Sequence, residues 1–496
     1  MEGALRLVPG VVATGMFLVG VGSAASAPRA LGQPATALTV VCAAALVLIA
    51  LVGGRSAGSD RSRWGRRTWE RLALLAAATV LVCTVVTVST SYRYGWDPVT
   101  VQQVAEGTRE PNSAIRYFSV YPNILPMLMI GKLAVWLERA IGLDYAAFFA
   151  VVAVASLAVT LAAGLVWLAR RGARPVQAAG FVVLTGLIVG ISPWMGVPYT
   201  DLVALPIPLL VVALLSFLPG LQSPRWMLLV AGLAVLVGIG WAVKTTPIVL
   251  LAAVVVGVLL APGDRPQWQR WSAGGAVVAL AWLTSAGLIA AAKPVSDLPL
   301  REGVEVDTSL YVAAGMRTQI YADGRRCYGC FDRRLTRPTY GKDTAAQRAV
   351  ALPAIRASLH DRTILGHGVF YAHKTHHTWG DGMFFAWGEG LDMEEPLQYR
   401  LSPDSFLRSV GTADGHLLGV RTAVVGGLWA GVLILAAVRL WQGRREWDLV
   451  AISAAVAGLF AFTTLFQGRG RYILVMAPVL IALACAPAAR RSAPRG

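Results

Sequence analysis

The sequence predicts an all-α polytopic membrane protein with about twelve transmembrane helices, on the evidence of its composition and the length of its apolar runs. Of its 496 residues, 56% are hydrophobic and only 14% are charged. Soluble domains carry about 25% charged residues, so this chain lacks the polar side chains needed to cover a water-facing surface. Many of its apolar runs are long enough to cross ~30 Å of hydrocarbon as a helix. These figures exclude disordered, collagen-like and disulfide-rich secreted proteins.

Twelve apolar segments are expected to form the membrane-spanning helices. In chain order they are residues 7–26, 35–53, 72–91, 146–169, 176–197, 201–219, 226–242, 246–261, 273–292, 418–439, 448–466 and 473–489. The first two are interpreted as a retained helical hairpin, not a cleaved signal peptide, because the second apolar run follows the first at once. The chain then divides into three N-terminal spans (1–91), a first outer loop (92–145), a membrane core (146–292), a large outer loop (293–417) and C-terminal spans with a basic tail (418–496).

The net charge of +17 sets the expected orientation. The first outer loop holds five basic and five acidic residues and the large one fifteen of each, so the excess lies in the short connections. Most of their arginines fall on one side, which the positive-inside rule makes cytoplasmic. Both termini are then inside and both long loops outside the plasma membrane. Because membrane topology accounts for the basic charge, no nucleic-acid partner is expected.

One further apolar stretch, residues 122–142, is predicted to lie on the outer membrane surface. It contains Lys132, Glu138 and Arg139, and counting it as a span would place a basic cluster outside. An amphipathic interfacial helix avoids both problems.

The five cysteines do not form a disulfide framework. Cys42, Cys83 and Cys485 lie in apolar segments, where a small buried hydrophobic residue is the usual role. Cys327 and Cys330 form a Cys-Tyr-Gly-Cys motif in the large loop, which suits a redox site, half of a zinc site or a local disulfide. The chain has no second such motif, and the outer compartment is oxidising, so a disulfide is expected.

Charged residues at the expected outer ends of the spans are the main functional candidates. They are Asp97, Asp201, Lys244, Arg469 and Arg471. Such charges are costly near hydrocarbon unless they are paired or hydrated. Arginine clamps phosphate oxygens, fixed cations stabilise a phosphate leaving group, and a lone carboxylate can accept a hydroxyl proton. The set therefore indicates a reaction on a lipid-linked phosphate. Taken singly, each residue also suits a snorkelling or helix-capping charge, and Asp97 suits a cap for a helix over residues 99–106.

A histidine cluster occurs in the large loop at His373, His376 and His377, followed by Asp381 and Glu389. This spacing permits metal ligation, but a hydrogen-bonded loop is favoured because the chain has no HExxH pattern. Glycines at 380, 382, 388 and 390 indicate tight turns. The chain has no P-loop or dinucleotide fingerprint. No cofactor is therefore required, and a histidine-bound divalent metal stays an open alternative.

Four short motifs resemble a Gram-positive branch of the GT-C superfamily, the polyprenyl-phosphate-sugar-dependent glycosyltransferases. Protein O-mannosyltransferases and the aminoarabinose transferase of lipid A are relatives in that superfamily. The segment YFSVYPNIL at 117–125 is similar to a YFxxYPNN stretch of this mannosyltransferase-like branch. SLYVAAGM at 309–316, KTHHTWGDG at 374–382 and RGRY at 469–472 resemble later stretches, in the same order. The early acidic residue of the first outer loop and the interfacial helix behind it fit the same pattern.

The resemblance implies a role for each matched residue. Asp97 would be the general base, and Lys244, Arg469 and Arg471 would hold the donor phosphate. Substrate-binding candidates are Arg116, Tyr121, Asn123, Asp201, Lys374, Asp381, Glu389 and Tyr472. The chain departs from the pattern in three places: Pro98 follows Asp97 where relatives often have a second acid, Ile124 replaces the second asparagine, and the hairpin 7–53 is extra.

The expected function is an inverting hexosyl or pentosyl transfer on the outer face of the plasma membrane. The donor would be a polyprenyl monophosphate sugar that enters from the surrounding lipids. The acceptor would be a cell-envelope glycan, glycolipid or protein. The main alternative is a transporter or a lipid-linked-glycan flippase, but the charges gather at one face and the loop of 125 residues suits an acceptor site. A second alternative is a polymerase or ligase that uses a diphosphate donor.

Overall fold

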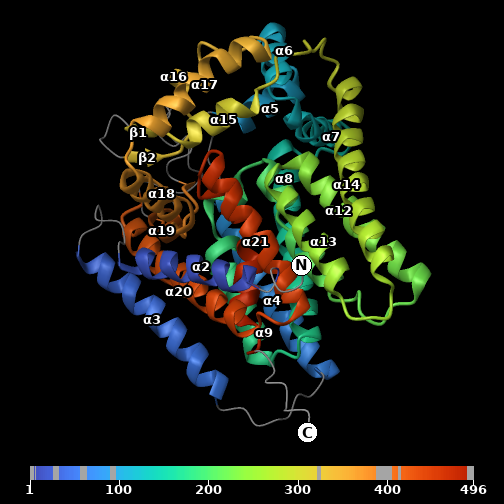
Figure 1. Ribbon diagram of the computed structural model, residues 1–496, viewed down its shortest axis with the longest axis vertical. Coiled ribbons are helices and arrows are strands. Elements are labelled where there is room, and N and C mark those ends of the chain that lie inside the picture. Colours follow the sequence, from blue (N-terminus) through green and yellow to red (C-terminus); the bar gives the residue numbers. More distant parts are fainter. Residues whose placement is uncertain are drawn as a thin grey trace.

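The computed structural model describes residues 5, 7–25, 33–55, 64–89, 96–320, 326–386, 405–411 and 415–488. Most of this part of the chain is helical (Figure 1). Its β-structure is one antiparallel ribbon, in which β1 (Thr318–Ile320) pairs with β2 (Arg326–Tyr328).

Six helices are long and apolar enough to cross a membrane. They are α4 (Arg66–Ser89), α8 (Tyr145–Arg170), α12 (Ser223–Val243), α14 (Gln267–Ser296), α20 (Leu418–Gln442) and α21 (Trp447–Leu465). Each coincides within a few residues with a span expected from the sequence. The prediction of a polytopic membrane protein is therefore confirmed.

The other six predicted spans correspond to two further apolar helices and four interrupted ones. They are α2 (Val8–Ala25), α3 (Gln33–Arg55), α9 with η3 (Pro175–Thr185, Gly186–Gly190), α10 with α11 (Thr200–Ala204, Ile207–Leu215), η5 with α13 (Thr246–Val249, Leu250–Leu260) and α22 with α23 (Arg471–Leu474, Ala477–Cys485). Prolines account for two interruptions, because Pro208 and Pro478 each lie in the first turn of the second helical piece. The total of twelve spans stays a prediction.

The N-terminal hairpin packs on the C-terminal part of the chain, since α2 and α3 both lie against α20 (Figure 1). The approach of α3 is close: a Cβ on Gly427 would meet the Thr39 carbonyl oxygen at 2.4 Å. The Thr39 hydroxyl donates to the Ala423 carbonyl at 3.1 Å. Small residues on α20 therefore fix where α3 packs.

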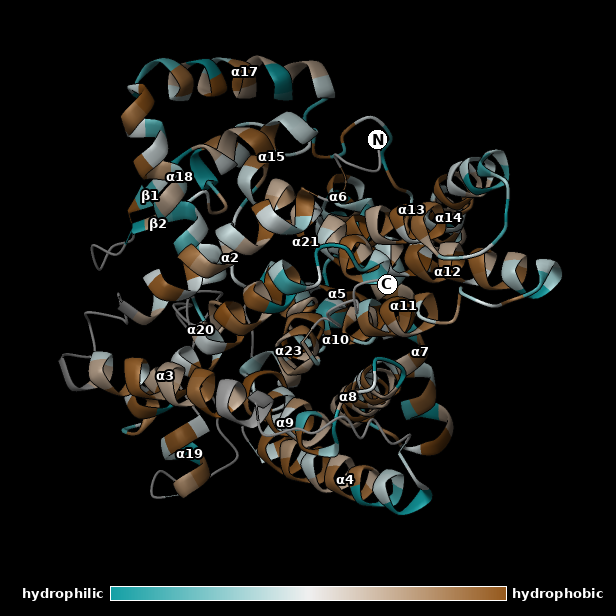
Figure 2. Cartoon of the chain, turned by 60° about the horizontal axis from the view of Figure 1, so that its bottom comes forward, coloured by the Kyte–Doolittle hydropathy of each residue, from teal (hydrophilic) through white to brown (hydrophobic). Residues whose placement is uncertain are grey.

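The two long polar loops gather at one end of the helices. The first forms α5 (Asp97–Glu106), α6 (Pro111–Val120), η2 (Pro122–Ile124) and α7 (Leu125–Ile141). The second forms α15 (Thr308–Gly315), α16 (Arg333–Thr336), α17 (Thr344–His360) and α18 (Ile364–Trp379) near the ribbon, and α19 (Phe406–Gly411), which packs against α20 and α4. The loops are joined by hydrogen bonds from Val306 N to Val120 O at 3.0 Å and from Arg301 N to Ser119 Oγ at 2.8 Å. In Figure 2, α17 and α18 carry more hydrophilic colour than α20 and α21.

The segment predicted to be interfacial is α7, which packs against α5, α8 and α14. Its Lys132 Nζ donates to the Val295 and Ser296 carbonyls, at 2.8 and 3.0 Å, and pairs with Asp297 at 2.8 Å. These contacts satisfy carbonyls at the C-terminal end of α14. The lysine that argued against a span thus ties α7 to α14, and its place at the membrane surface stays a prediction.

Candidate functional site

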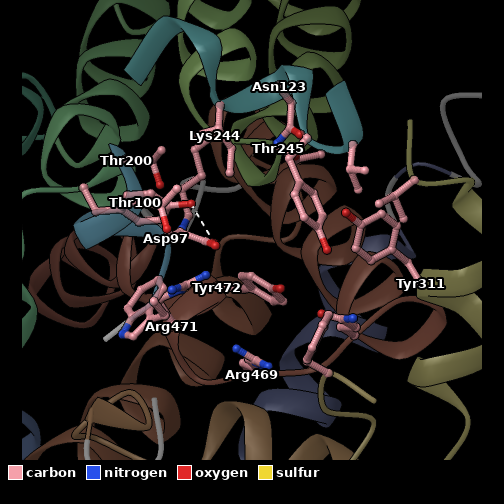
Figure 3. A pocket seen from close by; sticks show the side chains of 18 of the residues that line it. Asp97, Thr100, Asn123, Thr200, Lys244, Thr245, Tyr311, Arg469, Arg471 and Tyr472 are labelled. Carbon is pink, nitrogen blue, oxygen red and sulfur yellow. Dashed lines mark hydrogen bonds between the residues drawn. The ribbon is translucent and has the colours of Figure 1, made fainter. Parts of the chain in front are cut away.

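A cavity of about 1800 Å³ lies between the two outer loops and the adjoining helix ends (Figure 3). Its walls come from α5, η2, the start of α10, the connection after α12, the ribbon, α16 and the segment 466–472 that precedes and begins α22. The cavity brings together Asp97, Tyr121, Asn123, Lys244, Arg469, Arg471 and Tyr472, all predicted from the sequence. These residues come from four separate stretches of the chain.

Asp97 is the first residue of α5, where Pro98 suits the first helical turn. The N-cap is Trp96, and no side chain caps this helix, so the capping alternative for Asp97 is wrong. Its Oδ2 instead accepts a hydrogen bond from the Tyr199 hydroxyl at 3.1 Å. The carboxylate and burial raise the pKa of Tyr117, on α6, well above its usual value. Protonated phenols therefore surround a carboxylate at the cavity wall.

Lys244 and Arg471 share Asp201 as a buried counter-ion. Lys244 Nζ lies 2.5 Å from Asp201 Oδ1, and Arg471 Nε lies 4.0 Å from Asp201 Oδ2. Both cations line the cavity, whereas Asp201, only 2% exposed, lies behind them. Asp201 therefore orients two cations that line the cavity.

Aromatic rings hold the Arg471 guanidinium in place. Its Cζ lies 4.6 Å from the centroid of Trp96, 5.4 Å from Trp194 and 5.7 Å from Tyr199. Such cation–π contacts fix a guanidinium without neutralising it. The Arg469 Cζ lies 6.0 Å from the centroid of the Phe331 ring, which follows β2. Figure 3 shows Arg469, Arg471, Lys244 and Asp97 directed at one space.

Lys374, predicted to bind substrate, is part of the scaffold and is not among the described residues that line the cavity. It is 1% exposed, and its Nζ donates to the carbonyls of Gly315, Thr464 and Phe466 at 2.7, 2.7 and 2.6 Å. Burial lowers its pKa to about 7. The lysine joins α15 and the end of α21 to the segment that carries Arg469 and Arg471.

Asp381 also supports the site from behind. It is half-buried, and its carboxylate accepts from Met383 N at 2.8 Å and Phe385 N at 2.6 Å. This closes a turn in which Phe384 and Phe385 have φ of 54° and 59°. Gly470 lies against the turn, because a Cβ there would meet the Phe384 carbonyl carbon at 2.9 Å. The turn thus packs between Arg469 and Arg471.

Two other candidates lie away from the cavity or outside the described chain. Arg116 stacks over the Tyr340 ring at 5.1 Å and is not among the described lining residues. Glu389 lies outside the residues that the structure describes. Trp194 and Tyr199 were not predicted from the sequence, although Tyr199 lies two residues before Asp201.

The cysteine motif and the histidine cluster meet in space. Cys327 and Cys330 form a disulfide, and His377 Nε2 lies 3.2 and 3.9 Å from their sulfurs. The expected loop over 373–379 is wrong, since these histidines lie on α18. Burial lowers the pKa of His377 to about 4, so its ring is neutral. The three side chains have metal-ligand spacing, but sulfurs bonded to each other offer no thiolates to a metal.

The comparisons with known proteins identify a family but no activity. Residues 26–491 match the model of a family described as conserved hypothetical integral membrane protein. No curated protein and no solved structure matches the chain. Since the match spans nearly the whole sequence, the chain belongs to this family of conserved hypothetical integral membrane proteins.

Proposed function

We propose that the protein is an inverting glycosyltransferase that moves a sugar from a polyprenyl-phosphate donor to a cell-envelope acceptor. The observation that carries the proposal is one cavity in which Asp97 faces Lys244, Arg469 and Arg471. The carboxylate suits a general base, and the cations suit a phosphate leaving group. The cavity opens where the polar loops meet the helix ends, the depth expected of a lipid headgroup.

The donor phosphate binds at Lys244, Arg469 and Arg471 in this scheme. Arg471 is held in position by aromatic rings and by Asp201, so its guanidinium is pre-organised for phosphate oxygens. Lys244 contributes a second cation whose position is set by the same carboxylate. Pre-organised cations stabilise charge that develops as the bond to the sugar breaks.

Asp97 accepts the proton of the acceptor hydroxyl. As that oxygen attacks the anomeric carbon, the bond from the carbon to the phosphate oxygen breaks and the polyprenyl phosphate leaves with its electron pair. A single displacement inverts the anomeric centre. The Tyr199 hydroxyl, at 3.1 Å, holds the carboxylate in position and stabilises its charge before the proton arrives.

The rest of the lining favours a sugar. Amides are supplied by Gln102, Gln103, Asn123, Gln319 and Gln467, and rings by Tyr121, Tyr311 and Tyr472. Amides match ring hydroxyls, and aromatic faces match the apolar faces of pyranoses. The chemistry calls for no cofactor, because the phosphate already activates the sugar.

We also propose that this end of the molecule faces outward at the plasma membrane, with about twelve spans and both termini inside. Ala345→Cys, on exposed α17, should react with an impermeant thiol reagent on intact cells. Ser223→Cys, exposed at the start of α12, should react only after permeabilisation. Labelling of Ser223→Cys in intact cells would reverse the orientation.

A lipid-linked-glycan flippase is the second candidate. The observation in its favour is the interruption between α10 and α11 close to buried Asp201, since discontinuous helices are typical of transport sites. A flippase leaves the sugar–phosphate bond intact. Bond cleavage therefore separates the two functions.

The test is to incubate purified protein with labelled polyprenyl-phosphate mannose, arabinose and glucose in turn, with total cell-envelope acceptors. The proposal expects one donor to lose its label to an acceptor and Asp97→Asn to abolish the transfer. Glu110→Gln is the matched control, an exposed carboxylate of the same loop outside the described lining. Movement of intact donor across a bilayer without cleavage would favour the flippase.

A further inference from the structure

We propose that the acceptor is an anionic glycan and that Arg109, Arg333 and Arg334 bind its charged groups at the cavity wall. These three residues are called the arginine rim below. The inference rests on the proposed function and names the acceptor class. Charge is distributed unevenly along the large loop.

The large loop is neutral as a whole, but one stretch of its sequence is basic. Residues 317–337 contain six arginines and two aspartates. The cavity lining shows the same imbalance, since seven basic residues line it against four acidic ones. Lys244, Arg469 and Arg471 account for one phosphate of the donor. The other four basic residues, Arg109, Arg317, Arg333 and Arg334, need a separate explanation.

Asp332 does not neutralise the rim. It is 4% exposed; its Oδ1 accepts from Arg334 N at 2.8 Å at the start of α16, and its Oδ2 pairs with Arg317 Nε at 3.1 Å. This nearby carboxylate is therefore committed to Arg317 and to the backbone. Arg333 and Arg334 are exposed, and neither side chain forms an ion pair with another described residue.

The third rim residue keeps its charge as well. Arg109 Nη1 donates to Gln103 Oε1 at 2.8 Å and its Nε to Ser113 Oγ at 3.3 Å, both neutral acceptors. Glu106, one turn back on α5, accepts from Gln102 at 2.7 Å. Neutral hydrogen bonds orient a guanidinium and leave it free to bind an anion.

The rim consists of arginines only, which favours ligands whose anionic groups offer two oxygens. A guanidinium binds the two oxygens of a phosphodiester or a carboxylate in parallel, whereas an ammonium acts as a point charge. The donor brings one phosphate, which the Lys244 cluster holds. A second group of cations on the same cavity therefore fits anions on the acceptor, such as a polyol-phosphate chain or a uronate-containing glycan. Its field also concentrates an anionic polymer at the cavity.

Binding is measured with purified Asp97→Asn protein so that no probe is consumed. The probes are a polyol-phosphate oligomer, a uronate oligomer and a neutral oligosaccharide of equal length. The two anionic probes should bind at least about 10-fold more tightly than the neutral one, and 0.5 M salt should remove most of the difference. Comparing the two anions separates phosphodiester from carboxylate as the recognised group.

The rim is then changed within the same protein. Arg333→Gln with Arg334→Gln should weaken the anionic probes at least about 10-fold and leave the neutral probe unchanged. Arg326→Gln with Arg337→Gln is the matched control, two exposed arginines of the same stretch outside the described lining, and should change nothing. Equal binding of neutral and anionic probes, or full anion binding by the rim variant, would overturn the inference. Loss of binding to anionic lipid vesicles, with glycan binding intact, would assign the rim to the membrane and overturn it too.

The outcome is separable from that of the proposed function. Binding needs no turnover, so rim-dependent binding of polyanions with no cleavage of any donor would remove the transferase and keep the anion site. Transfer to neutral acceptors that the rim variant performs normally would keep the transferase and remove the anion site.

Discussion

The two ends of α21 hold clusters of charged residues that are arranged differently. At the Trp447 end, Arg171 forms ion pairs with both Glu446 and Asp448, so one cation meets two carboxylates. Beyond the Leu465 end, Lys244 and Arg471 share Asp201, and Arg469 adds a third cation. The first cluster is a set of ion pairs within the fold, whereas the second places three cations and Asp97 in the wall of one cavity.

The two ends differ in their cavities as well. The cavity at the Arg171 end measures about 600 Å³, a third of the volume at the other end, and its lining includes the ion pair itself. Nearby, Arg170 donates to the Ser216 carbonyl at 2.8 Å and stacks on Phe217 at 3.8 Å. Ion pairs beside a small cavity indicate a structural role. Several cations and a carboxylate in the wall of a large cavity indicate a ligand.

Asp97→Asn is expected to give the largest change. Asparagine keeps the size and a hydrogen-bond acceptor for Tyr199 but cannot take the acceptor proton. The transfer rate should fall by about 10²–10⁴-fold with donor affinity and unfolding midpoint unchanged. Single-turnover assays with labelled donor measure the rate. Transfer by Asp97→Asn at the wild-type rate would contradict the assignment of the general base.

Arg171→Gln tests whether the ion pairs at the Trp447 end of α21 serve stability alone. It leaves Glu446 and Asp448 without their cation, and loss of one partner from a largely buried ion pair costs about 3 kcal/mol. Unfolding in detergent should shift to lower denaturant by that free energy. Donor affinity of the folded protein should stay at the wild-type value. A loss of donor affinity at unchanged stability would show that this end also binds ligand.

Arg471→Lys is the matched substitution beyond the Leu465 end of α21. Lysine keeps the charge but loses the planar fork and its stacking on Trp96. Donor affinity should fall about 10-fold, equivalent to about 1.4 kcal/mol, and stability should change less than in Arg171→Gln. Arg444→Lys, an exposed arginine near the other end, serves as control. Titration of labelled donor measures the affinity, and unchanged affinity would remove Arg471 from the site.

Titration of Lys374 is expected to have a smaller, pH-dependent effect on donor affinity. Its pKa of about 7 means that raising the pH from 6 to 8 removes one of three N–H donors while three carbonyls need them. The segment with Arg469 and Arg471 loosens, and donor affinity should fall about 3-fold with a midpoint near pH 7. His377, with a pKa of about 4, does not titrate in this range. Lys374→Met should bind donor more weakly at every pH and show no such midpoint, and a midpoint that survives the substitution would belong to another group.

Much of this contrast could be predicted from the sequence. Hydropathy located the six long spans within a few residues, because bilayer thickness fixes the length of an apolar run. Asp97, Lys244, Arg469 and Arg471 were selected because charges beside apolar segments are costly without a role. All four line one cavity.

The misassigned residues share a physical cause. Lys374 and Asp381 were chosen from a motif, but a motif does not show whether a polar side chain faces a cavity or a set of backbone partners. Lys374 donates to three backbone carbonyls and Asp381 accepts from two backbone amides, so both side chains stabilise the fold. The contact of His377 with Cys327 joins residues 50 positions apart, which no local pattern predicts. Trp194 was missed because an aromatic residue in an apolar run gives no sign that it packs on a guanidinium.

Photocrosslinking of the donor tests whether its phosphate binds beside Lys244, Arg469 and Arg471. A polyprenyl-phosphate sugar with a photoreactive group beside its phosphate is bound to the purified protein, irradiated and mapped by peptide mass spectrometry. We expect crosslinks to the lining residues within 243–246 and 466–472, and their loss with excess unlabelled donor. Crosslinks centred on residues 170–171 and 445–448, beside the smaller cavity at the Trp447 end of α21, would contradict this placement of the donor.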